Sequence, residues 1–194
     1  KPNGQFIYDG FGKLLHKLSN GLNIKLNSVV KEIVQEKEFV KVITEDKIYN
    51  CKNVISTIPI GVLQSQLVKF TPDLPIIKKR SLRHLNSGNH EKIFFRFSKV
   101  FWDPKIVVYQ YASNKNRGLC TQWYNVLLPT KNKKILYTNL SGPDVKYANK
   151  SLKDLEKIGM NVLKRMFGND IPEPVQVYST KWSTDKFTMG GPYS

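Results

Sequence analysis

The chain of 194 residues lacks the short motifs that identify several large classes of enzyme. It contains no G-x-S-x-G, no G-x-x-x-x-G-K-[ST] and no G-x-G-x-x-G, so within these residues we expect no nucleophile elbow, no phosphate-binding loop and no dinucleotide fingerprint. Histidine is scarce, and His16, His84 and His90 do not pair with another histidine, cysteine or carboxylate at metal-ligand spacing. The sequence therefore predicts that the chain holds no metal.

Cysteine is also scarce, and long hydrophobic runs are missing. Cys51 and Cys120 show neither metal nor redox spacing, so we expect two isolated thiols. No stretch approaches the roughly 20 apolar residues of a membrane span, and no signal peptide is visible. The chain opens at KPNGQF without methionine and stops at GGPYS, so we expect a piece of a longer protein. No targeting signal shows the compartment, although the cytoplasm or the peroxisome is favoured.

Acidic residues are few for the number of basic ones. Lysine and arginine total 31 against 15 aspartates and glutamates, which gives a net charge of +16. Such an excess can attract nucleic acid, an anionic membrane or an acidic partner. The lysines are scattered rather than clustered, and we interpret the excess as a compositional bias, so a nucleic-acid partner is not expected. Hydrophobic residues make up 40% of the chain, which is enough for a core.

The first third of the chain predicts a helix followed by an antiparallel meander. Phe11, Leu14, Leu15 and Leu18 recur at the i, i+3, i+4, i+7 spacing of an amphipathic helix, and Asn20-Gly21 suits its end. Three β-like runs with polar turns between them come next, at residues 28–35, 38–45 and 47–59. Pro59 and Gly61 then punctuate the chain and predict a joint between two parts.

The remaining two thirds predict a mixed sheet with helices. A helix is expected to begin near Pro75. Ser151 and Asp154 form a capping-box pattern for a second helix that Gly168 ends. Five runs rich in β-branched and aromatic residues predict strands, at residues 91–98, 105–113, 118–128, 133–142 and 174–182. The element order indicates an α/β or α+β fold.

Three stretches together resemble the flavin-containing amine oxidases, which include polyamine oxidases, monoamine oxidases and lysine-specific histone demethylases. They are LNIKLNSVVKEI with the meander after it, VISTIPIGVLQSQLVKFTPDLPIIKK, and TKWSTDKFTMGGPYS. The segments GLCTQWYNVLL and LKRMFGNDIPEP look most like the polyamine oxidase branch. The resemblance runs nearly from end to end. It implies part of an FAD-binding domain at residues 1–62, a substrate domain with a mixed sheet flanked by helices at 63–181, and a segment at 182–194 that returns to the flavin. The family's dinucleotide fingerprint and its closing flavin-binding segment lie outside the stretch that the chain resembles, so a central portion of an oxidase is implied.

The resemblance also implies site residues. Lys92 precedes the apolar run Ile93-Phe94-Phe95 and the Phe101-Trp102 pair, where the family has a lysine that hydrogen-bonds a water near flavin N5. A donor there can orient a water that relays protons or meets oxygen, and burial against the flavin would lower the pKa of the lysine. A solvated lysine at a strand end is the alternative.

Other positions match residues that surround the cofactor or the substrate. The backbone of Val30 matches a contact with the adenine, with ordinary strand pairing as the alternative. Thr57 and Pro59 match the passage beside the dinucleotide, where Pro59 also simply ends a strand. Trp182 and Tyr193 match aromatic residues around the isoalloxazine, with core packing as the alternative for Trp182.

Two further positions refine the expected site. The side chain of His90 would share the strand face of Lys92 and could line the substrate tunnel, or simply be exposed. Tyr193 is expected on the substrate side of the flavin, where an aromatic face can attract an amine. Pro192 stands where monoamine oxidases carry the cysteine that bonds their flavin, so non-covalent FAD is implied.

The implied activity is oxidation of a C–N bond of a polyamine or related amine, with molecular oxygen as the second substrate and an aldehyde, an amine and hydrogen peroxide as products. One alternative is an oxidase of the histone-demethylase type, although no tower-like insertion interrupts residues 63–181. The other alternative is a non-catalytic basic module on an oxidase scaffold.

Overall fold

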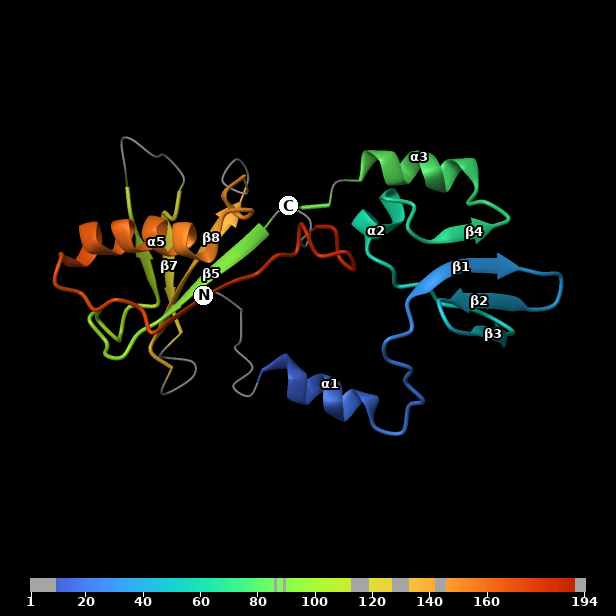
Figure 1. Cartoon of the computed structure of the whole chain (residues 1–194), viewed down its shortest axis with the longest axis horizontal. Coiled ribbons are helices and arrows are strands. Elements are labelled where there is room, and N and C mark those ends of the chain that lie inside the picture. The colour runs from blue at the N-terminus through green and yellow to red at the C-terminus, as the bar shows by residue number, and fades with distance from the viewer. Residues whose placement is uncertain are drawn as a thin grey trace. The chain divides into compact units, whose positions relative to one another are not determined.

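A computed structural model describes residues 10–85, 87–88, 90–112, 119–126, 133–141 and 146–190 of the chain (Figure 1). The chain divides into two compact units. Unit 1 comprises residues 1–14 and 89–182, and unit 2 comprises residues 15–88 and 183–194. Each unit has its own β-sheet, so the mixed α/β architecture expected from the sequence is present.

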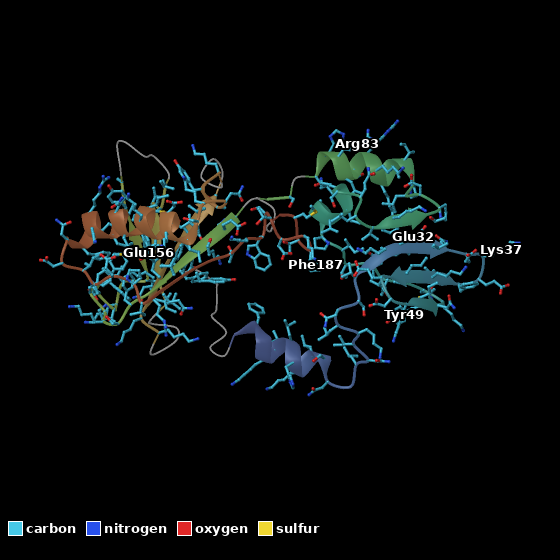
Figure 2. The ribbon with its side chains drawn as sticks, viewed as in Figure 1. Glu32, Lys37, Tyr49, Arg83, Glu156 and Phe187 are labelled. Carbon is cyan, nitrogen blue, oxygen red and sulfur yellow. The ribbon has the colours of Figure 1, made fainter. Side chains whose placement is uncertain are left out.

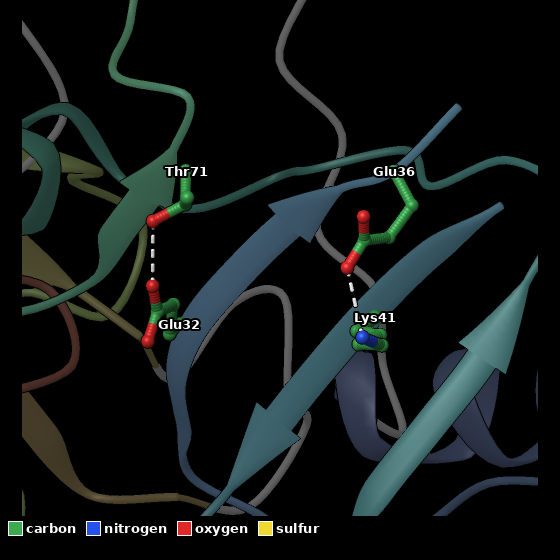
Figure 3. Close-up of polar contacts among 4 residues, drawn as sticks. All are labelled: Glu32, Glu36, Lys41 and Thr71. Atoms are coloured by element: carbon green, nitrogen blue, oxygen red, sulfur yellow. Dashed lines mark hydrogen bonds and ion pairs between the residues drawn. The ribbon is translucent and has the colours of Figure 1, made fainter.

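The sheet of unit 2 is built on the predicted meander. Its strand order is β3-β2-β1-β4, with β1 paired antiparallel to β2 and β2 antiparallel to β3. The strands are β1 (Val30–Gln35), β2 (Val40–Thr44), β3 (Ile48–Cys51) and β4 (Lys69–Thr71). Lys37 lies in the turn from β1 to β2, and Tyr49 lies on β3 (Figure 2). In that turn region Lys41 Nζ donates to Glu36 Oε1 over 2.8 Å (Figure 3).

Strand β4 is a feature that the sequence pattern did not predict. It pairs parallel to β1, with Glu32 opposite Lys69. The hydroxyl of Thr71 donates to Glu32 Oε1 over 2.6 Å, and Lys69 Nζ lies 3.0 Å from the same oxygen (Figure 3). The hydrogen bond from Thr71, followed by that from Lys69, holds the pKa of Glu32 below its ordinary value. Side-chain contacts therefore reinforce a strand pair that has only three residues on its β4 side.

The helices before β5 agree only in part with the sequence patterns. Helix α1 (Phe11–Ser19) is present as predicted, but none of its side chains is buried. Helix α3 (Ile76–His84) begins after Pro75, also as predicted. Pro59 does mark an element boundary, but as the N-cap of helix α2 (Ile60–Gln64), which the sequence pattern did not predict, and the strand of the predicted run 47–59 covers only Ile48–Cys51. Proline suits that position, since its fixed φ is compatible with a helix start.

The sheet of unit 1 has the order β6-β7-β8-β5-β9, and every pair in it is antiparallel. Its strands are β5 (His90–Arg96), β6 (Val108–Gln110), β7 (Gln122–Asn125), β8 (Ile135–Ser141) and β9 (Gln176–Ser179). Four of them fall within the predicted runs, and β5 begins one residue before its run, at His90; each strand is shorter than its run. The last strand, β9, pairs at the outer side of β5, although about 80 residues separate them in the sequence.

Helix α5 (Leu152–Phe167) covers one face of this sheet (Figure 1). The predicted capping box is confirmed: Ser151 Oγ accepts from the Asp154 backbone N–H and donates to the Asp154 carboxylate over 2.8 Å. Gly168 follows the helix with φ 94°, a conformation that favours glycine. The core lies between helix and sheet, and its largest fully buried apolar side chains are Trp123, Phe95, Ile93, Leu136, Leu140, Leu155 and Leu163.

Gly159 brings α5 close to the sheet. A Cβ atom at this position would overlap the ring of Phe95, which is fully buried. Neither group can move away without disturbing the core, since protein interiors are close-packed. The absence of a side chain at residue 159 therefore fixes the distance between helix and strand.

The predicted domain boundaries at residues 62/63 and 181/182 concern the domains of a whole oxidase and stay a prediction.

We predict that Gly159→Ala lowers the free energy of unfolding by about 1–3 kcal/mol, because the added methyl group overpacks the core against Phe95. Urea denaturation followed by circular dichroism measures this change. Gly12→Ala is the matched control, since a Cβ at residue 12 has no neighbour within 4 Å in the described structure and alanine favours a helix interior. Equal stability of the Gly159→Ala variant and the wild type would contradict this packing.

The lowered pKa of Glu32 predicts an acid-dependent contribution to stability. Because the folded state holds this pKa below its ordinary value of 4.5, the contribution is present above that value and is lost as the pH falls below it. We expect the acid limb of the stability profile to be shallower in Glu32→Gln than in the wild type. Glu38→Gln, in the exposed turn between β1 and β2, is the control. Identical acid limbs for Glu32→Gln and the wild type would refute the assignment.

Candidate functional site

Strand β5 presents two chemically different faces. Glu91, Ile93 and Phe95 are fully buried on the face toward α5. On the opposite face, His90, Lys92 and Phe94 are half-buried and Arg96 is exposed. A strand alternates its side chains between the two faces of a sheet, so this pattern follows directly from the sequence HEKIFFR. Helix α5 covers the first face, and the second face carries the lysine predicted for the site.

Lys92 lies within an aromatic environment rather than in open solvent. It is half-buried, and its Nζ atom lies 5.4 Å from the centroid of the Tyr137 ring. Burial, and then the neighbouring Tyr124, raise the pKa of Tyr137 above its ordinary value of 10.0. Tyr137 is therefore a neutral phenol at physiological pH, and its ring attracts the lysine through its π face rather than through a phenolate charge.

Four aromatic rings form a row across the same face of the sheet. The rings of Tyr124 and Tyr137 are stacked with centroids 4.8 Å apart, and Phe94 lies 5.2 Å from Tyr137 and 6.1 Å from Tyr178. These residues face one another because they are register partners on β7, β8, β5 and β9. The aromatic row gives this face a surface of packed rings, and the amine of Lys92 lies beside it.

A buried carboxylate lies behind Lys92 on the other face of β5. Glu91 Oε2 accepts the hydroxyl of Thr180 over 2.6 Å and the backbone N–H of Trp182 over 3.1 Å. Thr180 Oγ1 accepts the backbone N–H of Lys92 over 2.8 Å, and the Thr180 N–H donates to the Lys92 carbonyl over 3.0 Å. Sequence reasoning missed Glu91. The signal was available, because Glu91 shares the alternation of Ile93 and Phe95 and is a charged residue at a core position.

The other predicted site residues lie in both units. In unit 2, Val30 is the half-buried first residue of β1, while Thr57 and Pro59 are exposed in the segment before α2. In unit 1, Trp182 follows β9 and its side chain is 46% exposed, which does not support the alternative of core packing. Tyr193 and Pro192 lie outside the described residues.

Unit 2 also has a hollow of about 930 Å³ between α2, β4 and α3. None of the predicted site residues lines it. Its lysines are paired: Lys69 with Glu32 and Lys79 with Asp73, while Arg83 lies at the end of α3 (Figure 2). Pairing removes most of the attraction that these lysines would exert on an anion, so the hollow shows no chemistry of its own.

Metal-ligand clusters and membrane-spanning helices are both absent from the part of the chain that the structure describes. No group of three histidine, cysteine, aspartate or glutamate side chains is arranged to hold a metal ion there. Within the same residues, no helix combines the length and the apolar character that crossing a bilayer requires.

Comparison with known proteins identifies the family. Residues 3–194 match the family model of the flavin containing amine oxidoreductases. The chain belongs to this family. The resemblance read from the sequence motifs is thereby confirmed, and the amine oxidoreductase family uses a flavin.

Relatives from two branches of the amine oxidoreductases are equally similar to the chain. Lysine-specific histone demethylase 2 of Homo sapiens is 30% identical over 185 residues, which cover 91% of the chain and 22% of that protein. Polyamine oxidase 4 of Oryza sativa subsp. japonica is 30% identical over 185 residues, covering 95% of the chain and 37% of that protein. A structure of putrescine oxidase bound to putrescine matches with a TM-score of 0.80 and 17% identity, over 95% of the chain and 41% of that structure. The chain thus spans less than half the length of these relatives, and the preference for the polyamine branch stays a prediction.

The described residues fit a flavin in their chemistry. A flat aromatic ring system requires an apolar surface and hydrogen-bond donors at its edge, and the open face of β5 provides aromatic rings beside the amine of Lys92. In unit 2, the segment before α2 is exposed, and the side chain of Ile55 is 92% exposed.

We predict that Tyr137 ionises at a higher pH than an ordinary tyrosine, because burial disfavours the phenolate. The measurement is an ultraviolet titration of the wild type and of Tyr137→Phe, whose difference isolates this phenol. The difference should develop above pH 10.0, the ordinary value. Tyr49→Phe, on β3, serves as the control for loss of a tyrosine elsewhere. A midpoint for Tyr137 at or below the ordinary value would mean that this ring is not shielded as described.

Proposed function

We propose that the protein carrying this chain is an FAD-dependent oxidase that oxidises a C–N bond of a polyamine or related amine. The products are an imine, which hydrolyses to an aldehyde and a second amine, and hydrogen peroxide from molecular oxygen. The observation that carries the proposal is the placement of Lys92, half-buried beside the neutral ring of Tyr137, in a chain of the amine oxidoreductase family. The chain also resembles polyamine oxidases over nearly its whole length.

FAD, when bound, would supply the acceptor that takes a hydride from the carbon next to the amine nitrogen. Lys92 is assigned to hold a water at the edge of the flavin, because its amine is a donor in an aromatic, water-poor environment. Trp182 is assigned to the same part of the site, with an exposed indole that can shape a binding surface for an amine. His90 shares the face of Lys92 and is assigned to the substrate side.

Residues of unit 2 are assigned to the remainder of the cofactor. The backbone of Val30 would bind the adenine, and Thr57 and Pro59 would lie along the dinucleotide. Their positions at the start of β1 and in an exposed segment support these contacts. Tyr193 is assigned to the substrate side of the flavin on the strength of the family resemblance alone. Non-covalent binding of FAD is proposed because residue 192 is proline.

A methylated lysine side chain is the second candidate substrate. The equal identity to lysine-specific histone demethylase 2 favours it, since the two branches cannot be ranked by similarity. Both candidates are amines whose C–N bond would be oxidised in the same way. Spermine and a peptide with dimethylated lysine therefore distinguish the branches when each is added to the flavin-loaded full-length protein.

We predict that spermine, added without oxygen, bleaches the visible absorbance of the bound flavin, and that peroxide forms when oxygen is admitted. Lys92→Met should slow reoxidation by about 100-fold, because a positioned proton donor contributes on that order. Rapid-mixing spectroscopy measures both steps, and Lys99→Met, an exposed lysine after β5, is the control.

Three results of that experiment bear on the proposal differently. No bleaching by spermine, by acetylated spermine or by the methylated peptide would refute amine oxidation. Bleaching by the peptide alone would favour the second candidate. Reoxidation of Lys92→Met at the rate of Lys99→Met would remove Lys92 from the assigned role.

A further inference from the structure

The proposed function gives no role to the most deeply buried carboxylate among the described residues. Glu91 is 0% exposed, whereas the other buried polar side chains that the structure describes are the neutral groups of Thr44, Asn125, Thr138 and Ser179. Burial of a charged or strongly polar group is costly unless hydrogen bonds compensate it. The compensating groups identified for Glu91 come from the chain just after β9, at Thr180 and Trp182.

Glu91 and Lys92 are joined to Trp182 by a continuous set of hydrogen bonds. Glu91 Oε2 holds the Trp182 N–H and the Thr180 hydroxyl. The same hydroxyl oxygen accepts a hydrogen bond from the Lys92 N–H, and the Thr180 N–H donates to the Lys92 carbonyl. The last paired residue of β9 before this set is Ser179, opposite Ile93. Beyond that pair, one backbone bond, from the Thr180 N–H to the Lys92 carbonyl, and the side-chain bonds of Glu91 and Thr180 fix where the chain leaves the sheet.

We propose that Glu91 is a positioning residue that sets the indole of Trp182 relative to the amine of Lys92. The inference rests on the proposed function, in which both groups take part. Trp182 is 46% exposed, so packing alone does not hold its side chain, and its backbone N–H is fixed directly by Glu91. Lys92 is the residue after Glu91 on the same strand, so its backbone position is tied to that of Glu91. One carboxylate thus defines the separation of two groups that would contact the same cofactor.

This buried position requires a side chain that accepts two hydrogen bonds, one from the Thr180 hydroxyl and one from the Trp182 N–H. A carboxylate has two oxygen atoms and accepts several hydrogen bonds, and bonds to a charged acceptor are about twice as strong as neutral ones. Glutamine retains one acceptor oxygen in the same shape, whereas leucine leaves the Thr180 hydroxyl and the Trp182 N–H unpaired. The glutamine variant therefore keeps part of the hydrogen bonding of Glu91, whereas the leucine variant removes it.

The experiment uses the flavin-loaded full-length protein with Glu91→Gln, Glu91→Leu and Thr180→Val. The first readout is quenching of Trp182 fluorescence by FAD, taken as the difference from each variant in a Trp182→Phe background. The second readout is the rate of anaerobic flavin reduction and its dependence on spermine concentration. Glu156→Leu, on helix α5, is the matched control (Figure 2).

We expect Glu91→Leu and Thr180→Val to alter the quenching of Trp182 and to slow flavin reduction by roughly 100-fold, the usual effect of a displacement of about 1 Å. Glu91→Gln should lie closer to the wild type than Glu91→Leu, and Glu156→Leu should match the wild type. If Glu91→Leu does not fold, Thr180→Val carries the same comparison, since it removes the shared hydroxyl but keeps the Glu91 carboxylate and the hydrogen bond that it accepts from the Trp182 N–H.

The proposal is overturned if Glu91→Leu and Thr180→Val lower the melting temperature but leave both the Trp182 quenching and the reduction rate at wild-type values. That result would make Glu91 a purely structural group. Absence of flavin reduction by any amine in the wild type refutes the proposed function instead, and the fluorescence readout still decides whether Glu91 positions Trp182.

Discussion

The alternation of side chains along β5 is the constraint on which the rest of unit 1 depends. Ile93 and Phe95 must face α5 to form the core, which leaves Lys92 and Phe94 on the opposite face. A shift of one residue in register would bury the lysine and expose both core side chains. Gly159 tightens the constraint, because the helix approaches Phe95 so closely that no side chain fits between them. The position of the proposed functional amine is thus a consequence of core packing.

Glu91 is the exception to this division, and its bonds connect the two faces. It occupies a core position but accepts hydrogen bonds from Thr180 and Trp182. The Thr180 hydroxyl oxygen also accepts a hydrogen bond from the Lys92 backbone N–H. Proteins place costly buried polar groups where they fix a geometry that apolar packing leaves free. Here the geometry is the path of the chain after β9, which carries the exposed indole. The buried carboxylate and the proposed functional amine are therefore adjacent residues of one strand.

Local patterns predicted most of the elements, and non-local contacts account for the misses. The capping box of Ser151 and the meander of unit 2 depend on near neighbours, so the sequence indicated both correctly. Strand β4 was missed because three residues carry little pattern, and its partner β1 lies more than 30 residues away. Helix α2 was missed because Pro59 was interpreted as a break rather than as an N-cap. For the proposed site, the resemblance supplied only the assignment of Lys92, which stays a prediction, whereas its neighbours Tyr137 and Thr180 depend on strand register that local periodicity does not encode.

The claim at the centre of this account is that the face of β5 carrying Lys92 contacts the flavin. Chemical acetylation of lysines in the full-length protein, followed by mass spectrometry, tests it directly. FAD should strongly slow the modification of Lys92 and leave that of Lys99, exposed just beyond β5, unchanged. Equal modification of Lys92 with and without bound FAD would contradict the account.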